Sequence, residues 1–117
     1  MTIRRLKTYT GSQGYVYQYY FVGQRPAAGW PQATEYIFDV TSDRKLTYSV
    51  SVMLPRSVVL AWAESHRRAL GDSEQYAAVK LRLFRAFDEV ENMQAEGRQL
   101  QIDAPFLEEA LKSLGVD

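Results

Sequence analysis

Residues 33–54 alternate apolar and polar side chains so regularly that few folds other than a half-buried β-hairpin accommodate them. The segments ATEYIFDVT (33–41) and KLTYSVSVML (45–54) flank the turn residues SDR at 42–44. Successive side chains of a strand point to opposite faces, so each segment has one apolar and one polar face. The two apolar faces coincide when Val40 lies opposite Leu46, Phe38 opposite Tyr48 and Tyr36 opposite Val50. The outer face then holds the serines together with Glu35, Ile37 and Asp39.

The stretch GYVYQYYFVG at residues 14–23 predicts a further strand ahead of this hairpin, because it is rich in tyrosine and valine and bounded by glycines. One face of that strand carries four rings, from Tyr15, Tyr17, Tyr19 and Phe21. If this face is inside, the rings belong to the core. If it is outside, they stand beside Arg25 as a surface on which single-stranded nucleic acid stacks. The second arrangement buries Gln18, so we favour the core.

The segment QGYVYQYY at residues 13–20 resembles the aromatic strand of RNA-recognition motifs, and the matching positions are Gly14, Tyr15, Tyr17 and Tyr20. In that family the strand begins with a basic residue and follows a β-α-β run. Here the segment lacks the basic residue and forms the first predicted strand. The topology therefore excludes the family.

Residues 23–32, GQRPAAGWPQ, form a Gly/Pro-rich connection that is too long for a tight hairpin turn. Loops of this length often carry binding residues, because they vary without disturbing a core. Arg25 and Trp30 are the candidate contacts in this segment. The strand before it has aromatic residues on both faces, which also suits a homodimer that forms through the sheet.

From Pro55 onward the apolar period changes to that of a helix. We predict one helix that ends at Gly71 and a second over residues 72–96, capped by Asp72 and Gln75. RQLQI (98–102) is a short strand candidate, and Asp103 caps a last helix over residues 104–114. The predicted fold is α+β, with an antiparallel sheet of three to four strands in β-β-β-α-α-β-α order and helices packed on one face.

The length and composition indicate a single domain over residues 1–117, in which residues 1–12 form a flexible or edge segment. The 46% apolar and 24% charged shares are those of a soluble globular chain. The absence of cysteine excludes disulfides, thiolate metal sites and thiol nucleophiles. The N-terminal charges precede no apolar run of signal-peptide or membrane-span length, so we expect a cytoplasmic protein that does not bind membranes.

The net charge is zero but unevenly distributed, since residues 1–85 carry 12 basic and 6 acidic side chains and residues 86–117 carry 2 and 8. This asymmetry suits charge pairing within the chain, head-to-tail alignment of subunits, or binding of a polyanion by the basic part. The favoured interpretation is that the charges are simply solvated at the surface. The predicted helices also carry a secondary basic patch, formed by Arg67, Arg68, Lys80, Arg82 and Arg85.

No group of residues in the sequence has the pattern of a catalytic or cofactor site. His66 is the only histidine, and its position on an apolar helix face predicts a packed, hydrogen-bonded side chain. Ser65 points about 100° away from it, so the two cannot form a nucleophile–base pair. The spacing of Glu35 and Asp39 fits a solvated pair as well as a metal site. We therefore predict no enzyme activity, no cofactor and no metal.

Three segments, YVYQYYFVG, ATEYIFDVTSDR and AVKLRLFRAFDEV, resemble stretches of small conserved bacterial proteins of Burkholderia type. The resemblance extends over most of the chain and implies a bacterial protein. It implies no activity and assigns no functional residues.

These observations favour a non-enzymatic binding protein that engages a protein partner, or a second copy of itself, through the aromatic sheet face and residues 23–32. The candidate contacts are Tyr15, Tyr17, Tyr19, Phe21, Arg25 and Trp30. The alternative is a protein that binds single-stranded nucleic acid through Tyr15, Tyr17 and Tyr19 with the N-terminal residues Arg4, Arg5 and Lys7. The zero net charge weighs against this alternative, because phosphate contacts supply most sequence-independent affinity.

Overall fold

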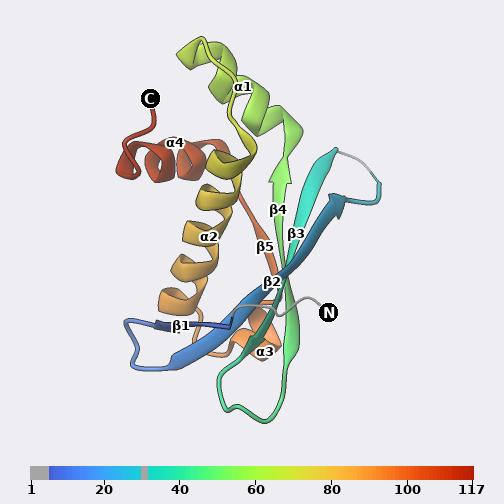
Figure 1. Cartoon of the computed structure of the whole chain (residues 1–117), viewed down its shortest axis with the longest axis vertical. Helices are drawn as coiled ribbons and strands as arrows, with labels where there is room; N and C mark the ends of the chain where they lie inside the picture. The colour runs from blue at the N-terminus through green and yellow to red at the C-terminus, as the bar shows by residue number, and fades with distance from the viewer. Residues whose placement is uncertain (1–5, 30–31) are drawn as a thin grey trace.

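The computed structural model describes residues 6–29 and 32–117, and within these ranges the chain forms five strands and four helices (Figure 1). The strands are β1 (Lys7–Thr10), β2 (Val16–Pro26), β3 (Ala33–Thr41), β4 (Tyr48–Pro55) and β5 (Gln99–Gln101). The helices are α1 (Arg56–His66), α2 (Asp72–Glu89), α3 (Met93–Glu96) and α4 (Ala104–Ser113). The predicted α+β class is confirmed.

The described strands form one sheet in the order β1-β2-β3-β4-β5, antiparallel except for the last pair. The predicted antiparallel arrangement holds for the first three strand pairs and fails for the last, and the predicted three to four strands are too few. β5 runs parallel to β4 because the chain first passes through the helical layer and then re-enters the sheet in the same direction. β1 was not predicted as a strand, because its sequence, KTYT, is too short to show an apolar period.

α2 and α4 cover one face of the sheet, and α1 continues beyond the end of β4 (Figure 1). The core lies between these layers, where Phe38 and Val50 of the sheet and Leu83 and Leu107 of the helices are fully buried. The opposite face of the hairpin carries Glu35, Asp39, Ser49 and Ser51 together with the apolar Ile37 and Met53. The alternation of residues 33–54 therefore predicted correctly which face of the hairpin is buried.

The register of the β3–β4 hairpin differs by two residues from the predicted one, with Phe38 opposite Val50 and Val40 opposite Tyr48. A shift of two positions keeps every side chain on its predicted face. The turn is longer than expected because the Asp43 carboxylate accepts hydrogen bonds from the backbone N–H groups of Lys45 and Leu46, at 2.8 and 2.9 Å. Leu46 consequently lies in this turn with its side chain 59% exposed, and its predicted place in the core is wrong.

Tyr17 and Tyr19 of β2 face the helices, which confirms the core interpretation for these two rings, whereas the Tyr20 hydroxyl bonds to Asp39 on the opposite face. Tyr17 and Tyr19 are 2% and 4% exposed. The ring of Tyr17 stacks on Phe87 of α2 with 4.2 Å between centroids, and Tyr9 of β1 stacks on Phe84 at 4.4 Å. β1, β2 and α2 thus share one aromatic layer, whose stacked and edge-to-face contacts add to the free energy gained from burial.

The loop between β1 and β2 is fastened to the C-terminal end of α2. The Asp88 carboxylate accepts hydrogen bonds from the Tyr9 hydroxyl, at 2.9 Å, and from the backbone N–H of Ser12, at 2.9 Å. Gly11 comes so close to the helix that a Cβ atom there would lie 2.6 Å from the carbonyl oxygen of Phe87. Only glycine permits this approach without a backbone shift.

Two helix boundaries differ from the predicted ones. α1 ends at His66, because Arg67 adopts the left-handed conformation (φ 57°) and its N–H bonds to the carbonyl of Ala63. The predicted helix over residues 72–96 divides into α2 and α3. At the division Val90 is extended, and the Asn92 side chain accepts a hydrogen bond from the Ala95 N–H as the N-cap of α3.

The predicted N-cap is correct for α4 and wrong for α2. Asp103 caps α4 as predicted, since its carboxylate accepts a hydrogen bond from the Phe106 N–H at 2.9 Å. At the start of α2 the predicted pair of Asp72 and Gln75 is wrong, because Gly71 is the N-cap and its N–H bonds to the Glu74 carboxylate at 2.9 Å. None of the described helices is long and apolar enough to span a bilayer.

Replacing Tyr17 by alanine should lower the free energy of unfolding by about 3–5 kcal/mol, because it removes a buried ring from the aromatic layer. Tyr15, two residues away, is 47% exposed. Tyr15→Ala should change stability by no more than about 0.5 kcal/mol. Urea unfolding followed by circular dichroism measures both effects, and equal losses for the two variants would contradict the assignment of the buried face.

Candidate functional site

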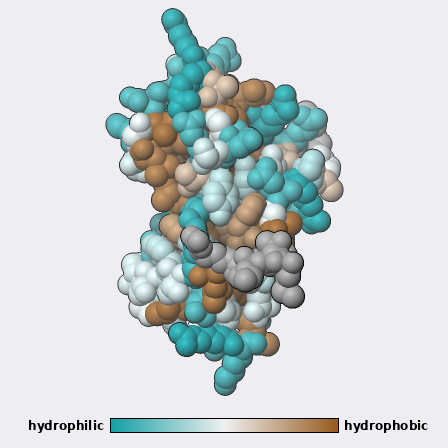
Figure 2. Space-filling view, viewed as in Figure 1, coloured by the Kyte–Doolittle hydropathy of each residue, from teal (hydrophilic) through white to brown (hydrophobic). Residues whose placement is uncertain are grey.

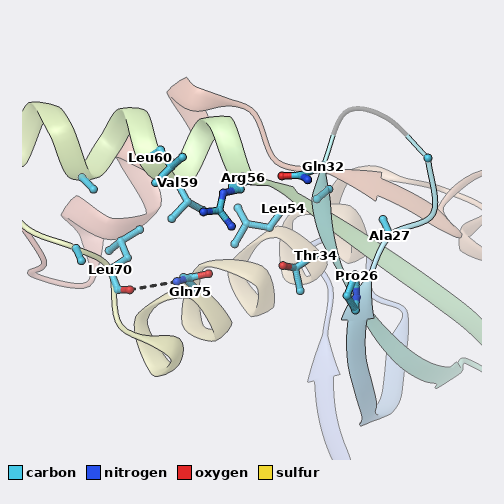
Figure 3. Close-up of a pocket in the computed structure, with 14 residues that line it drawn as sticks. Pro26, Ala27, Gln32, Thr34, Leu54, Arg56, Val59, Leu60, Leu70 and Gln75 are labelled. Carbon is cyan, nitrogen blue, oxygen red and sulfur yellow. Dashed lines mark hydrogen bonds between the residues drawn. The ribbon is translucent and has the colours of Figure 1, made fainter.

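A pocket of about 660 Å³ lies between the connection from β2 to β3, the end of β4 and the first turns of α1 (Figure 3). Its volume falls within the range of roughly 300–1,000 Å³ that is typical of small-ligand sites. Residues 26, 27, 29 and 32 of the predicted binding segment contribute to its lining. The predicted loop over residues 23–32 is too long, because residues 23–26 pair with β3 as the end of β2. The pocket thus forms beside the loop that the sequence singles out for binding.

The lining of the pocket is mainly apolar. Leu54 and Leu70 are buried, with 1% and 7% exposure, and form its inner surface. Val59 and Leu60 of α1 line the side to the left of Arg56 in Figure 3. Leu60 is 52% exposed, so the apolar lining reaches the molecular surface. In Figure 2, hydrophobic residues lie among hydrophilic ones at the surface of the upper half of the molecule, where α1 lies. The lower end, at the β3–β4 turn, is largely hydrophilic.

Three longer polar side chains border the pocket: Gln32, Arg56 and Gln75. Gln75 is held in place because its amide nitrogen donates a hydrogen bond to the carbonyl of Leu70 at 3.1 Å (Figure 3). Arg56 is the one charged residue in the described lining. No carboxylate of the described residues forms a salt bridge with its guanidinium. The pocket is therefore an apolar cavity beside a single unneutralised cation.

The outer face of the sheet contains a second ordered group of polar side chains. Glu35 of β3 accepts hydrogen bonds from the Ser51 hydroxyl at 2.7 Å and from Arg25 Nε at 2.8 Å. Both donors lower the pKa of Glu35, the serine contributing more. Glu35 is 9% exposed, so its predicted outer position is correct but it is not solvated.

Glu35 and Asp39 do not form a pair of carboxylates. Asp39 instead accepts a hydrogen bond from the Tyr20 hydroxyl at 2.7 Å. Within residues 6–29 and 32–117, no three histidine or carboxylate side chains converge in a group that suits a metal ion.

The predicted contact residues of β2 and the following loop lie in different environments. Tyr17 and Tyr19 are core residues, Phe21 packs half-buried against Tyr76 at 4.9 Å, and Tyr15 is exposed. The structure therefore does not place four rings in a row on the surface. Arg25 is bound to Glu35, and Trp30, like Arg4 and Arg5, lies outside the described residues.

The five members of the secondary basic patch lie in three places. Arg67 and Arg68 follow α1, where Arg68 pairs with Glu74 and lies over the Trp62 ring. Lys80 lies over the rings of Tyr76 and Phe84, on the side of α2 that faces β1. Arg82 and Arg85 lie over the Phe106 ring of α4. The helical cations therefore contact separate groups of side chains.

His66 packs as the sequence predicts. Its ring stacks on Trp62 with 4.2 Å between centroids, and its Nε2 lies 2.9 Å from the Glu108 carboxylate. These contacts join α1 to α4 and leave the histidine in a structural position.

Sequence reasoning missed the pocket and the residues Arg56 and Leu60. A signal was present, because at helical spacing Leu60 is an apolar residue that lies off the face shared by Val58 and Trp62. A helix with an apolar residue outside its core-facing stripe is a candidate for a second contact. The sequence could not show that Leu54 and Leu70 would lie opposite it.

Comparison with known proteins gave no matching family model, no matching curated protein and no matching solved structure.

Removing the Ser51 hydroxyl should destabilise the protein, because Glu35 then loses a buried hydrogen-bond donor. We expect Ser51→Ala to lower the free energy of unfolding by about 1–3 kcal/mol. Ser49 is an exposed serine on the same strand and face, and Ser49→Ala should remain within about 0.5 kcal/mol of the parent. Urea unfolding of the two variants makes the comparison, and a loss of similar size in both would exclude the role assigned to Ser51.

The lowered pKa of Glu35 also predicts an acid-sensitive contribution to stability. A carboxyl with a folded-state pKa below its ordinary value of 4.5 stabilises the fold above 4.5. That contribution disappears as the pH falls through the folded-state pKa. Unfolding free energies of the parent and Glu35→Gln should therefore differ near neutral pH and converge in acid, while exposed Glu64→Gln serves as the control. A gap independent of pH would refute the assignment.

Proposed function

We propose that this protein is a non-enzymatic binding protein that engages a protein partner through residues 23–32 and the pocket beside them. The observation that carries the proposal is the apolar pocket, whose lining extends to the surface at Leu60. Exposed apolar surface around a cavity is the usual form of a site that receives an anchor side chain from another molecule.

The chemistry of the pocket supports binding rather than catalysis. Among its described lining residues, Thr34 carries a hydroxyl, and there is no carboxylate, histidine or lysine. These side chains offer no general base and no activated nucleophile. Leu54, Val59 and Leu60 instead offer apolar contact area, which provides affinity without chemistry.

The position of the pocket supports a macromolecular partner. Residues 26, 27, 29 and 32 border it on one side and α1 on the other (Figure 3). A partner that inserts a side chain here would also meet the surface on both sides. The buried position of Tyr17 and Tyr19 argues against the inner face of β2 as the docking surface.

Replacing Leu60 by glutamine should weaken partner binding without affecting the fold. Peptides selected from a random displayed library by the parent protein serve as the probe, and fluorescence anisotropy measures their affinity. The loss of apolar contact is worth about 1 kcal/mol, or roughly a fivefold weaker Kd. Leu46→Gln is the matched control, because Leu46 is 59% exposed at the opposite end of the molecule.

Two results would overturn this proposal. In one, the selected peptides bind Leu60→Gln and Leu46→Gln equally, so that the pocket is not the binding site. In the other, sedimentation velocity shows that the parent is a dimer and Leu60→Gln a monomer, so that a second copy of the chain occupies the pocket.

A further inference from the structure

We infer that the partner group recognised by this pocket is a carboxylate next to a large apolar side chain, with the carboxylate bound by Arg56 and the apolar group in the cavity. This inference rests on the proposed function and names the chemistry of the partner. It follows from the position of Arg56, the apolar lining of the pocket and the amide group of Gln75 beside it.

Arg56 differs from most of the described arginines in having no polar partner. Arg25, Arg68 and Arg85 pair with carboxylates, and Arg82 and Arg98 donate hydrogen bonds to backbone carbonyls. Among the described residues, the guanidinium groups of Arg44, Arg56 and Arg67 form neither kind of bond. Arg44 lies in a turn and Arg67 caps α1, so Arg56 is the member of this group that borders the apolar pocket.

The surroundings of Arg56 favour an anion over a neutral group. Figure 3 shows its side chain extending across the pocket near Leu54 and Val59. Arg56 itself is exposed at the mouth of the pocket, and apolar neighbours on one side strengthen an ion pair relative to one wholly surrounded by solvent. The first turn of α1 contains no acidic residue, and its N-cap, Pro55, provides no side-chain hydrogen bond. The positive end of the α1 dipole therefore adds to the charge of Arg56.

The cavity has room for more than a carboxylate. Leu54, Leu60 and Leu70 provide apolar contacts that a carboxylate cannot satisfy, so the ligand needs an apolar group a few bonds away from its charge. A peptide segment with an acidic residue beside a leucine, phenylalanine or similar residue meets both requirements.

Gln75 provides a third point of recognition. Its amide nitrogen is committed to the carbonyl of Leu70, which fixes the side chain and leaves the oxygen, Oε1, able to accept a hydrogen bond. A backbone N–H of the bound peptide fits this acceptor. Arg56, the apolar lining and Gln75 together thus match the charge, side chain and backbone of one short segment.

The test uses the same displayed peptide library and the full-length chain. We expect the selected peptides to share an acidic residue adjacent to a large apolar residue. Converting that residue to its amide, Glu→Gln or Asp→Asn, should raise the Kd roughly tenfold, as expected for the loss of a charge-assisted contact. Arg56→Gln should produce a similar loss, whereas Lys45→Gln removes the same charge at the β3–β4 turn and should have no effect.

A double-mutant cycle decides whether the two charges meet. If they form one ion pair, combining Arg56→Gln with the amide peptide should cost little more than either change alone. The inference is wrong if the losses of affinity caused by Arg56→Gln and by the amide peptide multiply when the two changes are combined. It is also wrong if the selected peptides lack the acidic residue yet bind Leu60→Gln more weakly. This last result would leave the proposed function intact. If the selected peptides instead bind Leu60→Gln as tightly as the parent protein, the proposed function itself is wrong.

Discussion

The stack between Tyr17 of β2 and Phe87 of α2 determines how the sheet and the helical layer meet. It lies in an aromatic layer to which β1 also contributes, through the stack of Tyr9 on Phe84. Asp88 reinforces the same junction by accepting hydrogen bonds from Tyr9 and Ser12. Burial of aromatic rings contributes much of the stability in a chain of this size, so the face of β2 that carries Tyr17 and Tyr19 is turned toward the helices. The rings of Tyr17 and Tyr19 are consequently unavailable as a binding surface.

With the aromatic face committed to the core, exposed apolar surface is found at the other end of β2. There residues 26, 27 and 29 line one side of the pocket, and α1 continues from β4 on the opposite side. Leu54 and Leu70 close the inner wall, while Leu60 remains half exposed. The structure thus separates a stabilising aromatic layer from an apolar pocket bordered by Arg56, which forms no salt bridge with the described carboxylates.

Local patterns predicted the faces of the elements but not the contacts that arise only from tertiary structure. The alternation of residues 33–54 identified the buried face, yet the register depended on Asp43, whose hydrogen bonds lengthen the turn. The parallel pairing of β5 was not predictable, because three residues carry no directional signal. Length and composition predicted a binding loop over residues 23–32, but residues 23–26 pair with β3 as the end of β2, and the binding role stays a prediction. The pocket was missed, because it joins Leu54, Leu60 and Leu70 from three separate segments.

The most direct test of this account is a nuclear Overhauser measurement on the protein in solution, with tyrosine and phenylalanine rings selectively labelled. Strong cross-peaks between the ring protons of Tyr17 and Phe87 are predicted, because their centroids lie 4.2 Å apart. The same spectrum should show the contact between Tyr9 and Phe84. Absence of the first cross-peak, together with broadening of the Tyr17 ring signals by a soluble paramagnetic agent, would show that the ring faces solvent. That result would contradict the inward orientation of β2 and return its aromatic face to consideration as the binding surface.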